Sequence, residues 1–315
     1  MIGLGVLAAI FLACIPTLPW TLGWIGEDAA PYKKQNLDAA YLPPSWAPHG
    51  AESRDRLEAL AEPNAPPPIY FLGTDLLGRD LLARCLAGGG VSIGIGMSAA
   101  LISVVIGTLY GAASGYAGGR VDAAMMRIVD ILYGLPYILL VVLLAVAVDA
   151  VVDQKVAAGA DLSESALTFI NVVTLLVAIG GVSWLTMARV IRGQVLSLKE
   201  QPFIESARAI GAPIHVLFFR HLLPNLLGPI IVYATLTVPQ AILQESFLSF
   251  LGIGVQPPLP SWGNLAAEGL NELNTVKPRW WLLLFPSILL GVTLLALNFV
   301  GEGLREAFDP KRSKR

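Results

Sequence analysis

Charged side chains are scarce in this chain. Asp, Glu, Lys and Arg make up 14% of its 315 residues, whereas an ordinary soluble domain contains about 25%. Hydrophobic residues account for 55%, and the mean hydropathy is +0.66. This composition excludes an ordinary soluble domain and indicates a membrane protein with several spans. The net charge of −2 averages acidic segments on one side of the membrane with basic segments on the other. No basic patch interleaved with aromatic residues supports nucleic-acid binding.

Cysteine and histidine, which build most metal centres, are also scarce. Cys14 falls inside one apolar segment and Cys85 near the start of another, so neither a disulfide nor a metal site is expected. His215 and His221 have no carboxylate within a helical turn to orient them, and His49 lies in a proline-rich segment. The patterns His-Glu-x-x-His, Gly-x-Ser-x-Gly and G-x4-G-K-[ST] are absent. We therefore expect no enzymatic activity and no bound cofactor or metal.

Several apolar segments are long enough to cross a bilayer, which takes about 20 helical residues. The first contains Pro16 and Pro19 and is expected to be a retained span, because no basic residue precedes its apolar core. Trp280 and Trp281 at the start of the last segment are typical of an interfacial aromatic belt. The predicted fold is all-α, a polytopic membrane protein with six transmembrane helices. These are Ile2–Trp24, Val91–Gly111, Val129–Val148, Ala166–Met187, Leu226–Phe250 and Trp281–Gly301.

Lys and Arg are unevenly distributed among the connecting segments. Segments 117–128, 188–224 and 302–315 are richer in them than the segments that alternate with these. Positively charged connections stay in the cytoplasm, so both termini are expected there. Residues 149–165 carry no chemical motif and are expected to form a surface loop.

The predicted organisation follows from the spans and their orientation. Residues 1–24 form the first span and residues 25–90 an irregular, extracytoplasmic loop. Residues 91–301 form a five-span core that includes the cytoplasmic loop 188–224, and 302–315 form a cytoplasmic tail.

The polar segment Glu200–Asn225 separates the fourth and fifth spans. Phe203, Ala207 and Ile210 fall at i, i+4 and i+7, which predicts a short helix with one apolar face. An amphipathic hairpin lying on the membrane surface is the general alternative.

Glycine and proline predict how this segment turns. Gly211 is expected to end the first short helix, and Pro213 to start a second one. Pro224 is expected to close the second helix before the next span. Two short helices that meet at a glycine form a compact knob, which suggests a docking surface.

A second polar segment, Leu72–Asp80, precedes the second span. Thr74 or Asp75 is expected to cap a helix that continues into this span. Asp75 and Arg79 are spaced as an i, i+4 ion pair.

The pattern E-S-A-x3-G-x11-L-P in the Glu200–Asn225 segment resembles the cytoplasmic "EAA" coupling loop of ABC importer permeases, with Ser in place of the middle alanine. G-T-D-x-L-G-R-D before the second span is similar to the dipeptide, oligopeptide and nickel branch of that family, in its second or "C"-type subunit. The resemblance continues through Gly115–Asp122, Met126–Asp130, Ser246–Gly263 and Ala296–Pro310. The residues that match the coupling loop are Glu205, Ser206, Ala207, Gly211, Leu223 and Pro224.

This resemblance implies a type I permease fold that supplies half of a transmembrane pathway. Its implied partners are a second, homologous permease, ABC ATPase subunits that hydrolyse ATP, an extracytoplasmic solute-binding protein and the lipid of a bacterial or archaeal cytoplasmic membrane. The substrate would be a dipeptide, an oligopeptide or a related solute such as a nickel chelate, an opine or a sugar.

An ion- or proton-coupled secondary transporter is the alternative function. Such a protein needs ionisable groups within the membrane, and Glu245 is the one clear acid in the predicted spans. We expect Gln244 and Glu245 to line a translocation path near its outer end, or Glu245 to pair with a group on a neighbouring span. Asn171 and Asn298 are expected to join helices by hydrogen bonds. A passive pore or scaffold would not explain the cytoplasmic knob together with the proline-stiffened segment Gln256–Pro260.

Overall fold

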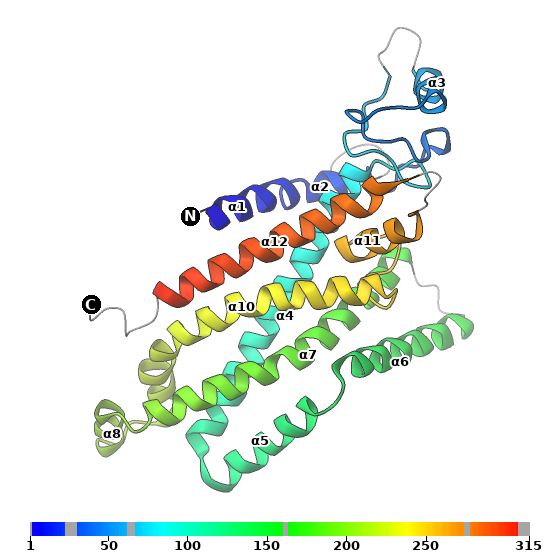
Figure 1. Ribbon diagram of the computed structural model, residues 1–315. Helices are drawn as coiled ribbons and strands as arrows, with labels where there is room; N and C mark the ends of the chain where they lie inside the picture. The colour runs from blue at the N-terminus through cyan, green and yellow to red at the C-terminus, as the bar shows by residue number, and fades with distance from the viewer. Residues whose placement is uncertain (1, 23–29, 62–66, 160–162, 274–277, 308–315) are drawn as a thin grey trace. The chain divides into compact units, whose positions relative to one another are not determined.

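A computed structural model of the chain describes residues 2–22, 30–61, 67–159, 163–273 and 278–307 (Figure 1). Within these residues every helix or strand element is helical, which confirms the predicted all-α class. The chain forms two compact units. Unit 1 consists of Met1–Ile95, Glu164–Asn171 and Ile242–Ala296, and unit 2 of Gly96–Ser163, Val172–Ala241 and Leu297–Arg315.

The helices follow one another along the chain with short connections between most of them (Figure 1). They are α1 (Ile2–Cys14), α2 (Leu18–Thr21), η1 (Leu37–Ala39), α3 (Ala51–Ala59), α4 (Leu81–Ala117), α5 (Gly119–Tyr133), α6 (Tyr137–Ala157), α7 (Glu164–Leu198), α8 (Pro202–Ala209), α9 (Ile214–Val216), η2 (Leu217–Leu222), α10 (Leu223–Phe250), α11 (Trp262–Asn271) and α12 (Trp280–Ala307).

Six helical segments among the described residues are long and apolar enough to cross a membrane, which confirms the predicted number. Several extend beyond the predicted spans, because hydropathy marks only the apolar part of a helix. The predicted end of the outer loop at Gly90 lies inside α4, which already begins at Leu81. The six segments are Gly3–Thr21, Leu81–Ala117, Tyr137–Ala157, Ser165–Leu198, Ile214–Phe250 and Trp280–Ala307.

The third span begins later than predicted. The chain leaves the helical conformation at Gly134 after α5 and resumes it at Tyr137, the start of α6. Pro136 explains the break, since it lacks a backbone donor and disfavours a helical residue before it. The prediction of a surface loop over residues 149–165 was wrong for residues 149–157, because α6 continues to Ala157.

The first span is interrupted. Pro16 separates α1 from α2, and the hydroxyl of Thr17 donates to the carbonyl of Ala13 at 2.5 Å within the turn. The predicted end of this span, Trp24, lies outside the described residues, as does the predicted tail after Ala307.

Thr74 joins three parts of unit 1. Its hydroxyl donates to the carbonyl of Ala39 at 2.5 Å and accepts from the amide of Leu42 at 2.7 Å. Its carbonyl accepts from Nε1 of Trp281 at 3.2 Å. The prediction that Thr74 or Asp75 caps α4 was wrong, because α4 begins only at Leu81. Asp80 caps it, with Oδ1 accepting from the amide of Leu82 at 2.9 Å.

A buried ion cluster follows this segment in unit 1. Asp75 accepts from Nε of Arg79 at 2.6 Å, which confirms the predicted pair. Arg84, 3% exposed at its side chain, donates to Asp75 at 2.7 Å and to both carboxylate oxygens of Glu268 at 2.6 and 3.0 Å. These bonds offset part of the cost of burying the arginine charge, although its Nε has no hydrogen-bond partner among the described residues. The cluster fixes the start of α4 to α11.

Glycines bring α4 and α7 into close contact in unit 2. A Cβ atom on Gly111 would lie 2.3 Å from the carbonyl oxygen of Ala188, and one on Gly107 would lie 2.5 Å from the side chain of Met187. Small residues spaced by four allow such backbone contact between membrane helices.

We predict that Gly111→Val destabilises the protein. Overpacking costs about 1–3 kcal/mol, so thermal unfolding of the purified protein in detergent should shift down by several degrees. Gly94→Val on the same helix is the matched control, because a Cβ there meets nothing within 4 Å. Equal melting temperatures for the two variants would contradict the close contact.

Candidate functional site

The predicted knob between the fourth and fifth spans belongs to unit 2 and begins with α8 (Figure 1). Pro202 occupies the first turn of α8, where no backbone donor is needed. Ile204 is 1% exposed and packs in an apolar cluster with Ile191 of α7 and Leu226 of α10. One face of α8 is therefore fixed to the unit.

The buried face of α8 differs from the predicted one. Ala207 is buried as expected, but Phe203 is 41% and Ile210 85% exposed. Phe203 and Ile204 are adjacent and both apolar, so periodicity alone fits either of two faces. The apolar cluster selects the face that carries Ile204.

Gly211 ends α8 as predicted. Its φ is +77°, a conformation that costs glycine little. The amide of Gly211 donates to the carbonyl of Arg208 at 2.9 Å, and that of Ala212 to the carbonyl of Ala207 at 3.1 Å. These bonds satisfy the last carbonyls of α8. Pro213 then precedes α9, also as predicted.

Pro224 does not close the second helix, contrary to expectation. The chain remains helical from Ile214 to Phe250 and passes through the π-helical turn η2 before Pro224. A proline ring clashes with the preceding α-helical turn, and a wider turn offers one way to accommodate it. The second short helix is therefore the beginning of the fifth span.

The outer surface of the knob carries large apolar side chains together with charged ones, among them Glu205, Arg208 and Arg220. Phe203, Ile210, Ile214 and Phe219 are large apolar side chains exposed on it, and Glu205 is exposed beside them. We call these five residues the knob face. Exposed apolar groups gathered in this way are typical of a surface that binds a partner.

The other residues matched to the coupling loop, Ser206, Leu223 and Pro224, differ in their surroundings. The hydroxyl of Ser206 donates to the carbonyl of Pro202 at 2.8 Å within α8. Leu223 is partly buried and packs against the apolar cluster that holds Ile204. Pro224 is exposed in the first turn of α10.

A second polar site lies in unit 1 around Glu245. This side chain is fully buried, and its carboxyl accepts hydrogen bonds from Ser249 at 2.7 Å and from Ser246 at 3.2 Å. Ser92 and Ser261 also bond to it. These four serines and Glu245 form what we call the serine cage. The expectation that Glu245 bonds to a neighbouring helix agrees with the contribution of Ser92 from α4.

The serine cage holds the segment between α10 and α11. The hydroxyl of Ser249 accepts from the amide of Val255 at 2.9 Å, and Ser261 caps α11 by a reciprocal pair of bonds with Asn264. The amide group of Asn264 donates to the carbonyls of Val255 and Leu259 at 3.3 and 3.0 Å. Asn171 of α7 donates to the carbonyl of Gly254 at 3.4 Å, so it joins α7 to this segment and not, as was expected of it, to another helix.

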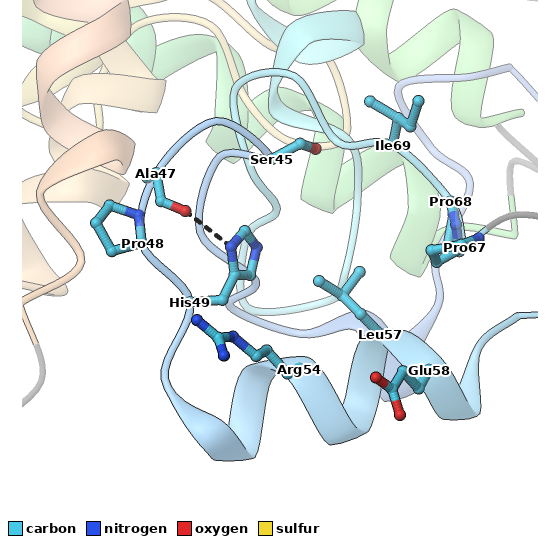
Figure 2. A pocket seen from close by; sticks show the side chains of 10 residues that line it. All are labelled: Ser45, Ala47, Pro48, His49, Arg54, Leu57, Glu58, Pro67, Pro68 and Ile69. Atoms are coloured by element: carbon cyan, nitrogen blue, oxygen red, sulfur yellow. Dashed lines mark hydrogen bonds between the residues drawn. The ribbon is translucent and has the colours of Figure 1, made fainter.

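A pocket of about 410 Å³ lies beside α3 in unit 1 (Figure 2). His49 faces it, and its Nδ1 donates to the carbonyl of Ala47 at 2.8 Å. Arg54 and Glu58 line its edge from α3, and Pro67, Pro68 and Ile69 line the opposite wall. Across the described residues no group of three or more His, Cys, Asp or Glu side chains is arranged to hold a metal ion.

The sequence analysis did not predict two pairs of charged residues. Arg84 and Glu268 are 184 positions apart, and Asp122 and Arg192 are 70 apart. Nothing local marks either pairing. The one available signal was that Asp122 is the last residue of the segment Gly115–Asp122, which resembles the permease family.

Residues 95–314 match the family described as "binding-protein-dependent transport system inner membrane component". The chain belongs to this family, and within it to the permease subunits of ABC importers.

Two curated relatives support that assignment. The chain is 41% identical over 273 residues to the dipeptide transport system permease protein DppC of Bacillus subtilis, covering 86% of this chain and 77% of the relative. It is 49% identical over 244 residues to the oligopeptide transport system permease protein OppC of Escherichia coli K12, covering 77% of this chain and 72% of the relative.

Solved structures support the fold. A chain of the MetNI methionine ABC transporter in an inward-facing conformation aligns with a TM-score of 0.53 at 18% identity, covering 71% of this chain and 96% of that chain. The predicted ABC importer permease fold is thereby confirmed.

We predict that Ser249→Ala loosens the segment after α10. The change leaves the buried amide of Val255 without its acceptor, which costs about 1–3 kcal/mol. Amide hydrogen exchange of the peptide that contains Val255 should accelerate, and the melting temperature should fall. Ser197→Ala on the exposed surface of α7 is the control. Unchanged exchange at Val255 would contradict the role given to Ser249.

Proposed function

We propose that this chain supplies half of a transmembrane pathway for peptides, with ATPase subunits docking on the knob face. The observation that carries the proposal is the two-sided nature of α8. Ile204 and Ala207 anchor it in unit 2, while Phe203, Glu205 and Ile210 are exposed. A helix that is anchored on one side and exposes apolar and charged side chains on the other is suited to receive force from a partner and pass it to the spans.

The rest of the assembly follows from this role. A second, homologous permease supplies the other half of the pathway, and an extracytoplasmic binding protein delivers the solute. Peptides are the proposed solute because dipeptide and oligopeptide transport are named for the relatives. The knob and both termini face the cytoplasm. ATP is hydrolysed by the partner subunits, and this chain performs no catalysis and binds no cofactor.

The residues matched to the coupling loop have different roles in this proposal. Glu205 faces the ATPase and pairs with a basic group there. Ser206 and Ala207 shape α8, and Gly211 sets the angle between α8 and the helix that begins at Ile214. Leu223 and Pro224 join the knob to α10, so that a movement of the knob tilts the fifth span as a rigid body.

Of the two residues proposed to line the pathway, Gln244 is the better candidate. It is half-buried, and its Oε1 has no hydrogen-bond partner among the described residues. Glu245 is enclosed by the serine cage, which favours a structural role and offers little support for an ion-coupled transporter.

The test is co-purification of the tagged chain from membranes in mild detergent, with ATPase activity assayed on the eluate. The wild-type chain should retain a second permease and ATPase subunits. Glu205→Lys should reduce the retained ATPase by about tenfold, the effect of losing one hydrogen-bonded charge pair, with insertion unchanged. Glu302→Lys, an exposed acid on α12, is the control.

Two results would argue against the proposal. Elution of the wild-type chain alone, without ATPase activity, would favour a secondary transporter. Equal ATPase retention by Glu205→Lys and Glu302→Lys would show that Glu205 does not belong to the docking surface.

A second prediction compares two substitutions of Gly211. Gly211→Val should impair peptide uptake strongly, because a β-branched residue is strained at a φ of +77°. Gly211→Asn should retain most of the uptake, since asparagine tolerates this conformation. A Cβ atom at residue 211 meets nothing within 4 Å, so steric crowding does not confound the comparison. Similar uptake by both variants would show that the turn conformation is unimportant.

A further inference from the structure

One carboxylate joins three helices of unit 2. Asp122, in the first turn of α5, is buried, and its Oδ1 accepts from the hydroxyl of Ser114 on α4 at 2.5 Å. Arg192 of α7 donates through Nε to Oδ1 at 2.5 Å and through Nη2 to Oδ2 at 2.6 Å. This two-pronged geometry fixes direction as well as distance. We call these three residues the Asp122 node.

The carboxylate of the node is charged at neutral pH. The hydrogen bonds from Arg192 hold the pKa of Asp122 below its ordinary value, despite the opposing effect of burial. The carboxylate is therefore ionised at neutral pH, and Arg192 is paired with a full negative charge.

Helix α5 has few other anchors. Asp122 and Val129 are its buried residues, whereas Val121, Ile128 and Ile131 are more than half exposed. Further along, the hydroxyl of Tyr110 donates to the carbonyl of Met125 at 2.9 Å, and Arg189 pairs with Asp130 at 2.8 Å on the surface. The position of the start of α5 thus depends largely on the Asp122 node.

The same turn of α4 also contacts the knob. Ser114 belongs to the node, and the carbonyl of the next residue, Gly115, accepts from Nζ of Lys199 at 3.1 Å. The following residue, Tyr116, lies 5.0 Å from the guanidinium of Arg208 on α8, a cation–π contact. Three consecutive residues of α4 therefore connect α5, the end of α7 and α8.

The helices cannot slide past one another at this turn. A Cβ atom on Gly115 would lie 2.9 Å from the carbonyl oxygen of Arg192, so the backbones of α4 and α7 are in direct contact beside the node. The contact of Arg208 with Tyr116 and this backbone contact together link α8 to the node.

We propose that Asp122 is a positioning residue for transport, which makes α5 follow the movement of α8. Because α6 begins shortly after α5 ends, the movement reaches the third span as well as the fifth. This inference rests on the proposed docking of ATPase subunits at the knob. The node determines how much transport results from each hydrolysed ATP, and it does not determine whether ATP is hydrolysed.

The experiment uses the whole complex of this chain, the second permease, the ATPase subunits and the binding protein in proteoliposomes. ATP hydrolysis and uptake of a radiolabelled dipeptide and oligopeptide mixture are measured on the same vesicles. Asp122→Asn and Arg192→Gln should each retain assembly and hydrolysis while uptake falls about tenfold, the effect of losing a hydrogen bond to a charged group. The side chain of Arg192 is 34% exposed, so water can solvate it in Asp122→Asn.

Two further variants separate the node from charge in general. The double variant Asp122→Asn, Arg192→Gln should be no worse than either single one, because both changes remove the same interaction. Arg127→Gln removes an exposed charge from the same helix and should leave the ratio of uptake to hydrolysis unchanged.

A wild-type ratio in Asp122→Asn, or additive losses in the double variant, would overturn the proposal. If Asp122→Asn fails to assemble, Asp122→Glu decides, since it keeps the charge but displaces it by one methylene. A lowered ratio in Asp122→Glu would support the positioning role, and a wild-type ratio would overturn it. Absence of ATP-dependent uptake in the wild-type complex would contradict the proposed function instead, and the two failures are therefore distinct.

Discussion

A polar group that is buried away from water has lost its hydrogen bonds to the solvent, so its partners must come from the protein. Three ionisable side chains show how this chain meets that constraint. Arg84 is matched by two carboxylates, Glu245 by serine hydroxyls and Asp122 by Arg192 with Ser114. Each of these sets of contacts joins at least two helices, which makes the polar contacts specific where apolar packing alone would leave the helices free to rotate or slide.

Hydropathy predicted the number of spans but not their limits. The apolar window of a helix reports where lipid could lie, whereas the ends of a helix depend on capping and on neighbours. Asp80 begins α4 ten residues before the predicted end of the outer loop, and Pro136 delays α6. Asp149 and Asp153 both lie on an exposed part of α6, so a helix tolerates charges that by composition suggested a loop.

The knob was predictable where its chemistry is local. Gly211 is needed because its own backbone has a positive φ, and that requirement is visible in the sequence as glycine followed closely by proline. The buried face of α8 is different, because Ile204 is selected over Phe203 by side chains from α7 and α10. The pairing of Asp122 with Arg192 is likewise a property of two distant segments, and residue spacing carries no information about it.

The π-helical turn η2 has a geometric consequence for the knob. A wider turn contains one residue more than an α-helical turn, and each residue of an α-helix corresponds to about 100° of rotation. The side chains before Leu217 are therefore out of phase with those after Leu222 by roughly that angle. Deleting a single residue within η2 would restore one continuous phase and swing α9, and with it α8, around the axis of α10. The direction in which the knob points is thus encoded by one inserted residue.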